Sequence, residues 1–268
     1  MSAVESSLME AGNTTLYVER SGEGPAIVLV PGAGGDAGQY AGLAAELSRT
    51  RTVIAYDRRG NSRSPRTDDW ATTSVDQHAD DVLALIEALD LDRATLFGNS
   101  TGAVIALAAA LRRHPSVAGL IAHEPTLFGV LADPDGAVAS VQPIIAAAVE
   151  QGGLPEGAEA FLRFAAGEAF DSLPADAIDR IRANAQTMLE AEFGAFASWL
   201  PDRGELDALG VPSVVLSAEQ TAPFFVEAAE WLAAQLGTVV VNVPGGHMGF
   251  LDHEADFAKQ IELAYLGD

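Results

Sequence analysis

A single serine between two glycines constrains this chain more than any other feature. The residues Gly98-Asn99-Ser100-Thr101-Gly102 follow a short apolar run and precede a helical run of small residues. In this pattern the chain leaves a strand and enters a helix within about two residues, which predicts a strained backbone at Ser100. Glycine on both sides removes Cβ atoms that would collide where strand and helix approach. We therefore interpret Ser100 as a nucleophile at a helix N-terminus, where partial positive charge favours a developing anion.

Strands alternate with helices along most of the chain, which predicts an α/β protein. Apolar, β-branched runs at residues 26–30, 52–56, 117–122, 211–217 and 239–243 are typical of strands buried on both faces. Helical periodicity appears at 39–48, 75–89, 224–236 and 254–265, and residues 6–20 alternate around a Gly12-Asn13 turn as in a β-hairpin. The alternation predicts right-handed crossovers and a mostly parallel sheet.

The alternation stops between residues 125 and 203. Three stretches there, 143–150, 157–170 and 174–200, have helical patterns separated by glycine and proline. We predict that residues 1–124 and 204–268 form the core and that residues 125–203 form a helical cap above the carboxyl edge of the sheet.

Charge and composition narrow the classes of partner. The 268 residues carry a formal net charge of −23, which argues against nucleic acid and anionic membrane surfaces. The chain has no cysteine, which excludes disulfides and a thiolate nucleophile. No signal peptide and no apolar run of membrane-spanning length is visible, so we expect a cytoplasmic protein with a small-molecule substrate. We expect no cofactor and no metal, and both a monomer and a homodimer stay open.

A serine nucleophile needs a general base, and His247 is the best placed of five histidines. It lies in a flexible loop, Pro244-Gly245-Gly246-His247, directly after the last predicted strand. Functional groups in such sheets gather beyond the carboxyl ends of strands. By contrast, His78 and His253 are expected on or beside exposed acidic helical stretches, His114 at a helix end, and His123 at the end of a strand.

The base in turn needs a carboxylate that fixes its tautomer and stabilises the imidazolium. In this topology the acid usually follows the strand at residues 211–217, but Thr221 stands where an aspartate is expected. Glu124, in the turn after residues 117–122, can reach the same imidazole from the neighbouring strand end. We favour Glu124, with Glu219 and Asp252 as alternatives.

The negative oxygen formed by attack on a carbonyl needs two backbone donors. We assign them to the N–H groups of Thr101 and of Ala33, which lies in the glycine-rich loop after residues 26–30. Asp57, which ends a strand, is expected to bond turn amides and to have no catalytic role. An apolar pocket between sheet and insertion is expected to bind substrate through Gly32, Phe128, Met188, Trp199, Phe224 and Met248.

Together these motifs resemble the α/β-hydrolase family over nearly the whole chain. The resemblance implies an eight-stranded, mostly parallel sheet with helices on both faces and a helical cap. Within that family, the runs Gly98 to Gly102, His123-Glu124-Pro125, Phe224-Phe225 and Pro244 to His247 are similar to the fungal zearalenone lactonases. In that group the acid is a glutamate at the position of Glu124, whereas the insertion does not match clearly.

The sequence therefore predicts a serine hydrolase that cleaves an ester or lactone bond of a hydrophobic small molecule through an acyl-enzyme. The same fold also hosts lyases and cyclases that form no acyl-enzyme, and ligand receptors that turn nothing over. Epoxide hydrolases and haloalkane dehalogenases use an aspartate nucleophile, and Ser100 argues against both.

Overall fold

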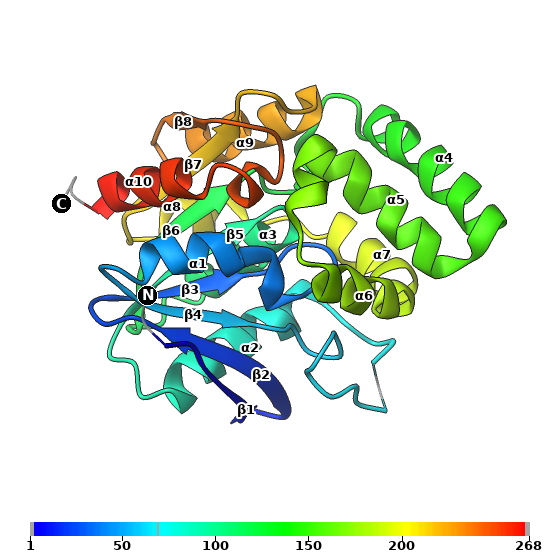
Figure 1. Ribbon diagram of the computed structural model, residues 1–268. Coiled ribbons are helices and arrows are strands. Elements are labelled where there is room, and N and C mark those ends of the chain that lie inside the picture. The colour runs from blue at the N-terminus through cyan, green and yellow to red at the C-terminus, as the bar shows by residue number, and fades with distance from the viewer. Residues whose placement is uncertain (1–2, 69, 266–268) are drawn as a thin grey trace.

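A computed structural model describes residues 3–68 and 70–265, and it contains one eight-stranded sheet (Figure 1). The strand order is β1-β2-β4-β3-β5-β6-β7-β8, and every pairing from β4 to β8 is parallel. The strands are β1 (Glu5–Ala11), β2 (Thr14–Ser21), β3 (Ala26–Val30), β4 (Thr52–Tyr56), β5 (Ala94–Asn99), β6 (Val117–His123), β7 (Ser213–Ala218) and β8 (Val240–Val243). The predicted parallel sheet is thus confirmed.

The predicted hairpin forms the antiparallel edge of this sheet. Strands β1 and β2 pair antiparallel from Glu5↔Arg20 to Ala11↔Thr14, and β2 then pairs with β4. The central strands β3, β4 and β5 are buried along their whole length. Their apolar runs therefore have the composition that two covered faces require.

Helices cover both faces of the sheet, each with its own apolar core. On one face lie α2 (Val75–Ala88), α3 (Thr101–Leu111), α8 (Arg203–Asp207) and α9 (Pro223–Gln235). On the other lie η1 (Ala37–Tyr40), α1 (Ala41–Leu47), η5 (Gly249–Leu251) and α10 (Glu254–Tyr265). Every residue of α3 is buried, which explains its small side chains: this helix packs directly against β5 and β6.

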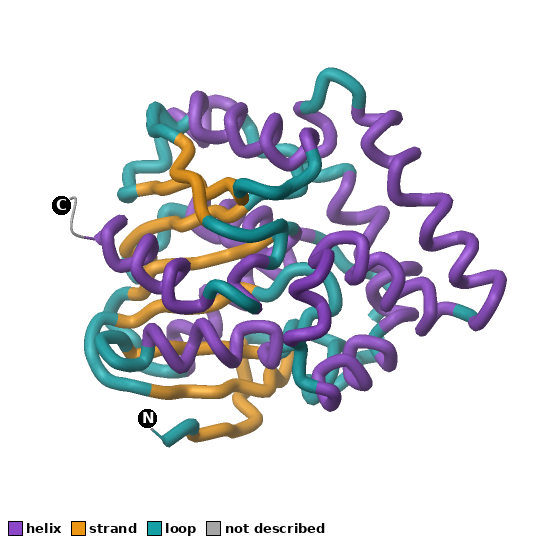
Figure 2. Tube along the Cα trace, turned by 45° about the horizontal axis from the view of Figure 1, so that its top comes forward, coloured by secondary structure: helices purple, strands orange, loops and turns teal. Residues whose placement is uncertain are grey.

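The chain between β6 and β7 contains helices only. Before α8 they are η2 (Phe128–Val130), α4 (Pro134–Gly152), α5 (Leu154–Ala166), η3 (Gly167–Ser172), α6 (Ala175–Ala183), the π-helix η4 (Thr187–Glu192) and α7 (Phe193–Ala197). Figure 2 shows α4 to α7 at one end of the strands rather than on either face of the sheet. Below, α4 to α7 are called the inserted helices, and the division into core and cap stays a prediction.

All three predicted helical stretches in this segment differ from the structure in their boundaries, and the stretch at 157–170 is α5 followed by η3. Helix α4 begins at Pro134, not at Pro143, because the Asp133 side chain accepts the Gly136 N–H and caps an earlier start. Pro143 lies inside the helix. The loss of one backbone hydrogen bond is tolerable there because Ala137 is the one buried residue of α4. The expected helix at 174–200 is divided into three pieces, which are α6, the π-helix η4 and α7. No helix in the described part of the chain is long and apolar enough to cross a membrane.

Candidate active site

The predicted turn at Ser100 is present and strained. Ser100 has φ 58° and ψ −126°, in the positive-φ region that side chains other than glycine rarely adopt, and α3 begins at the next residue. A Cβ atom on Gly98 would lie 2.2 Å from the Gly102 carbonyl oxygen, and one on Gly102 would lie 2.1 Å from the Val30 oxygen. Gly98 is therefore required for strand β5 and helix α3 to meet this closely, and Gly102 for helix α3 to approach the end of strand β3.

The glycine-rich loop after β3 lies directly against this turn. A Cβ atom on Gly32 would lie 2.9 Å from the Asn99 carbonyl oxygen and 3.2 Å from Ser100 Cβ. Because the loop has no bulky side chain here, its backbone can approach the serine. The N–H of Thr101, in the first turn of α3, has no acceptor within the helix, as is general for first-turn amides. Both predicted oxyanion donors are thus close in the chain or in space to Ser100.

Glu124 is fully buried at the end of β6, and its carboxylate accepts four hydrogen bonds. His247 Nδ1 lies 2.6 Å from Oε2. The remaining three donors are the Ala218 N–H at 2.8 Å, the Thr221 hydroxyl at 3.0 Å and the Ser217 hydroxyl at 3.3 Å. Burial acts to raise the pKa of Glu124. The His247 hydrogen bond and the charges of His123 and His247 outweigh it and hold this pKa at about 2. The carboxylate is therefore ionised at neutral pH.

The contact with an ionised carboxylate fixes the tautomer of His247. Since a carboxylate only accepts, Nδ1 must carry a proton, and Nε2 is left with the lone pair of a neutral imidazole. The ring is stacked on Phe225, with centroids 3.7 Å apart and planes 9° apart. The His247 carbonyl accepts a 2.9 Å hydrogen bond from Asn99 Nδ2. The imidazole is thus held through its ring face, one nitrogen and its backbone.

Ser100 and His247 make no hydrogen bond to each other among those found between described residues. Both are nearly inaccessible, and Ser100 N–H donates to the carbonyl of His123, the residue before Glu124. A nucleophile and its base are often farther apart in ligand-free enzymes and approach when substrate binds. The free Nε2 is the nitrogen that can take the serine proton.

The other acids and histidines are placed differently. Glu219 and Asp252, the alternative acids, are both exposed. His78 is buried, which corrects the expectation of an exposed histidine. It follows Val75 by three residues and precedes Val82 by four, so it lies on the buried side of α2. Burial and the charges of Arg58 and Arg59 hold the pKa of His78 well below its usual value.

An apolar cavity of about 510 Å³ extends from Ser100 and Thr101 to the inserted helices. Phe128 and Phe224, both predicted to contact substrate, line it together with residues of α4, α5 and α7. The other four predicted contacts are not among its lining residues. Met188 and Met248 are buried in a core cluster, Trp199 packs on the other core, and Gly32 lies against the serine turn.

A second cavity of about 360 Å³ lies on the His247 side. Its lining includes Glu168, Gln220, Asp252 and His253 and is more polar than that of the first cavity. Phe164, Ala165 and Phe225 line both cavities, whereas Ser100 lines only the first and His247 only the second. In the described part of the chain, no three His, Asp or Glu side chains are placed to hold a metal ion.

Comparison with known proteins identifies the family of this fold. The pattern of the α/β-hydrolase fold family matches residues 25–254. The chain belongs to the α/β-hydrolase family. This chain is 28% identical over 263 residues to a Bacillus subtilis protein named uncharacterized hydrolase YraK, and the match covers 96% of this chain and 95% of that protein.

Solved structures share the fold of this chain. The enol-lactonase from Burkholderia xenovorans LB400 is 22% identical with a TM-score of 0.78, over 97% of this chain and all of that one. The carboxylesterase CesB from Bacillus subtilis is 19% identical with a TM-score of 0.77, over 99% of this chain and 93% of that one.

No role for Thr221 or for the Asn99 side chain was predicted from the sequence. Thr221 occupies the position where an aspartate was expected, and its hydroxyl bonds Glu124 instead. Asn99 Nδ2 also lies 3.0 Å from His123 Nδ1, so Asn99 bridges His123 and the His247 carbonyl. The signal for Thr221 was present in the sequence: a displaced acid leaves its usual position free for a donor.

Proposed function

We propose that this protein hydrolyses ester or lactone bonds of hydrophobic small molecules, with Ser100 as nucleophile, His247 as base and Glu124 as acid. One arrangement carries the proposal. A strained serine at a helix N-terminus opens onto an apolar cavity, and a buried Glu124–His247 pair lies beside the same strand ends. The enol-lactonase and the carboxylesterase of the same fold support the class of reaction.

In this mechanism Ser100 Oγ attacks the substrate carbonyl carbon while His247 Nε2 takes the serine proton. The carbonyl oxygen becomes an oxyanion that the Ala33 and Thr101 N–H groups stabilise. The C–O bond to the leaving alcohol then breaks, and His247 returns the proton to the alkoxide. Water, deprotonated by His247, attacks the acyl-enzyme, and collapse of the second intermediate releases the acid and restores the serine.

Glu124 acts through His247. Its carboxylate keeps the Nδ1 proton in place, which leaves Nε2 as the base, and it stabilises the imidazolium that forms during each proton transfer. Four hydrogen bonds hold the carboxylate, so little reorganisation accompanies the charge change. The likeness to zearalenone lactonases supports a glutamate at this position rather than any one substrate.

The cavity suggests the chemistry of the substrate. Phenylalanines from core and insertion line it, including Phe128, Phe161, Phe193 and Phe224. Such a lining favours an apolar acyl chain or ring next to the scissile carbonyl. A volume of about 510 Å³ is within the range for a small-molecule site.

The test is turnover of a panel of aryl esters and lactones by the wild type and by Ser100→Ala. We expect kcat to fall by about 10⁴-fold or more, because the triad acts as a unit. Ser6→Ala, at an exposed serine of β1, is the matched control and should leave kcat unchanged. Full turnover by Ser100→Ala would overturn the assignment.

Isotope labelling separates hydrolysis from lyase or cyclase chemistry. In water enriched in oxygen-18, hydrolysis places one labelled oxygen in the released acid, because water supplies the hydroxyl that replaces the alcohol. Product without the label would favour the non-hydrolytic alternative, and binding without turnover would favour a receptor.

A further inference from the structure

The glycine-rich loop beside Ser100 is held from its carbonyl side. The Gly32 oxygen accepts the Gly35 N–H at 3.1 Å and Arg58 Nη2 at 3.1 Å. The next two carbonyls also accept side-chain donors: Ala33 O from Gln39 Nε2 at 2.8 Å, and Gly34 O from Asn184 Nδ2 at 2.8 Å. Three consecutive peptide oxygens are therefore directed to named donors.

Peptide geometry converts this into an orientation of N–H groups. In a trans peptide the carbonyl oxygen of one residue and the N–H of the next point in opposite directions. Holding the Gly32 oxygen toward Arg58 therefore turns the Ala33 N–H the other way. No hydrogen bond between described residues uses that N–H. A flipped Gly32–Ala33 peptide would instead present its oxygen, which would repel a developing oxyanion.

Arg58 is itself held by a residue of the inserted helices. Its side chain is fully buried, and Nη1 and Nη2 each lie 2.7 Å from a carboxylate oxygen of Glu192, the last residue of the π-helix. Asn61 Nδ2 adds a 2.9 Å hydrogen bond to the same carboxylate. The Arg58 backbone N–H also donates to the Gly35 oxygen at 2.8 Å. Arg58 thus holds both ends of the loop and is held by the insertion in return.

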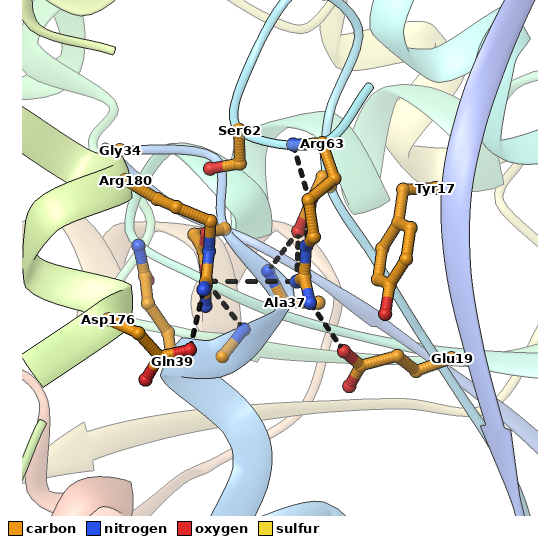
Figure 3. Close-up of polar contacts among 12 residues, drawn as sticks. Tyr17, Glu19, Gly34, Ala37, Gln39, Ser62, Arg63, Asp176 and Arg180 are labelled. Atoms are coloured by element: carbon orange, nitrogen blue, oxygen red, sulfur yellow. Dashed lines mark hydrogen bonds and ion pairs between the residues drawn. The ribbon is translucent and has the colours of Figure 1, made fainter. Parts of the chain in front are cut away.

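A neighbouring cluster anchors the same insertion beyond the loop. Arg180 of α6 donates to both oxygens of Asp36, the N-cap residue of η1, and Arg63 donates to Asp57 and to Glu19. Figure 3 shows Arg63 alongside the Tyr17 ring, with its guanidinium carbon 3.8 Å from the ring centroid. The Arg180 contacts join the inserted helices to the segment that begins η1, but neither arginine donates to the Gly32 carbonyl.

We propose that Arg58, clamped by Glu192, is a positioning residue that orients the Gly32–Ala33 peptide so that the Ala33 N–H faces the oxyanion. A buried ion pair is a poor stabilising device, because desolvation offsets its attraction and apolar replacements are often as stable. The contact with the loop carbonyl gives this pair a different use. The inference rests on the proposed hydrolysis and adds that the inserted helices must dock for the oxyanion site to form.

The test replaces both charges at once, as Arg58→Met with Glu192→Met. Removing both partners avoids an unpaired buried charge, so the double variant should unfold within a few degrees of the wild type. We expect kcat for an aryl ester to fall about 10- to 100-fold, with KM changed less than about threefold, because the lost interaction acts mainly in the transition state. Affinity for a boronic acid, which mimics the tetrahedral intermediate, should fall in parallel.

The matched control is another buried pair, Arg59 and Asp81. Arg59 Nε lies 2.8 Å from Asp81 Oδ2, and both side chains are buried, but the pair makes no hydrogen bond to the loop carbonyls. Arg59→Met with Asp81→Leu should leave kcat within about twofold. An equal loss of kcat in this control would overturn the proposal, as would full kcat in the Arg58/Glu192 double variant.

Glu192→Asp provides a second variant if the double variant does not fold. It keeps a negative charge beside buried Arg58 but draws the carboxylate back by one methylene, so it should lose less kcat than the double variant and retain most boronic acid affinity. A crystal structure of either variant with an unchanged Gly32–Ala33 peptide, alongside a reduced kcat, would overturn the positioning role. The orientation of the Gly32–Ala33 peptide can be read from the crystal structure whether or not the variant is active. A wild type that hydrolyses nothing would overturn the proposed function, while a turned peptide in the variant would still support the positioning.

Discussion

The two sides of Ser100 are built from different parts of the chain. On the acid side, Glu124 receives its hydrogen bonds from β7, from the turn after it and from the loop after β8. All of these belong to the sheet and its connections. On the oxyanion side, the loop carbonyls are held by Asn184 directly and by Glu192 through Arg58, both in the insertion.

This difference suggests how the site could be lost or tuned. The acid side depends on strand ends that parallel pairing brings together, so it is complete wherever the sheet is folded. The oxyanion side depends on contacts of Arg58 and the loop after β3 with the inserted helices, and such contacts need the inserted helices to be docked. We therefore expect substitutions on the two sides to differ in size and in kinetic signature.

Among substitutions on the two sides of Ser100, the largest loss of kcat is expected from Glu124→Gln on the acid side. The amide can accept the Ala218 N–H with its oxygen, which leaves its NH₂ group facing His247 Nδ1 and favours the wrong tautomer. We expect kcat to fall by about 10³-fold or more with little change in KM. Steady-state kinetics with an aryl ester measures this.

The same substitution at exposed Glu219, which sequence reasoning kept as an alternative acid, is the control. If Glu219→Gln lost activity and Glu124→Gln kept it, the acid side as described would be wrong.

The next effect concerns how the free energy of unfolding changes with pH. Burial, helped by the His247 charge and opposed by Glu124, lowers the pKa of His123 from 6.5 to about 4. As the pH falls below about 6.5, His123 takes up a proton in the unfolded chain but not in the folded protein. The free energy of unfolding therefore decreases as the pH falls from about 6.5 to about 4. The loss from this residue is about 3 kcal/mol. Buried His78 acts in the same direction.

Urea unfolding at several pH values measures this slope. His123→Gln should flatten the curve between pH 6.5 and 4 and leave the share that His78 contributes. Equal slopes in wild type and His123→Gln would show that His123 does not titrate as its burial implies.

Sequence patterns were sufficient for the parts of the site that local chemistry dictates. The glycines around Ser100 predicted its strained turn, and the strand-end positions of Glu124 and His247 predicted their contact. The position of Glu124 could be inferred because β6 neighbours both β5 and β7 in the sheet, so its carboxyl end must lie near theirs.

Features that depend on packing between distant segments could not be predicted in this way. Nothing near Asn184 or Glu192 indicates a contact with a loop about 150 residues earlier. Apolar sequence patterns did not distinguish Phe224 of α9, on the cavity, from Met188 of the π-helix η4, in the core. His78 carries a polar side chain in an acidic helix, and only its register relative to Val75 and Val82 indicated burial.

A smaller effect is expected from Asn184→Ala on the oxyanion side. The change removes the donor to the Gly34 carbonyl and two hydrogen bonds with Ser62. We expect kcat to fall about 10-fold, less than from loss of a whole oxyanion donor, because Gln39 and Arg58 still hold the neighbouring carbonyls. Gln186→Ala, an exposed amide in the same segment, is the control and should keep full kcat. An unchanged kcat in Asn184→Ala would remove the insertion's direct role in the loop.

The smallest effect is expected from Thr221→Val, which keeps the shape of the side chain and removes one of the four donors to Glu124. The Ala218 N–H, the Ser217 hydroxyl and His247 remain, so the carboxylate stays ionised and aligned. We expect kcat to fall about threefold, and Thr221→Ser, which keeps the hydroxyl, to fall less. The acid side has spare donors within one rigid sheet, whereas each oxyanion-side carbonyl beyond Gly32 has a single side-chain donor. A loss in Thr221→Val as large as that in Asn184→Ala would mean that the sheet gives the acid no such redundancy, and the contrast between the two sides would fail.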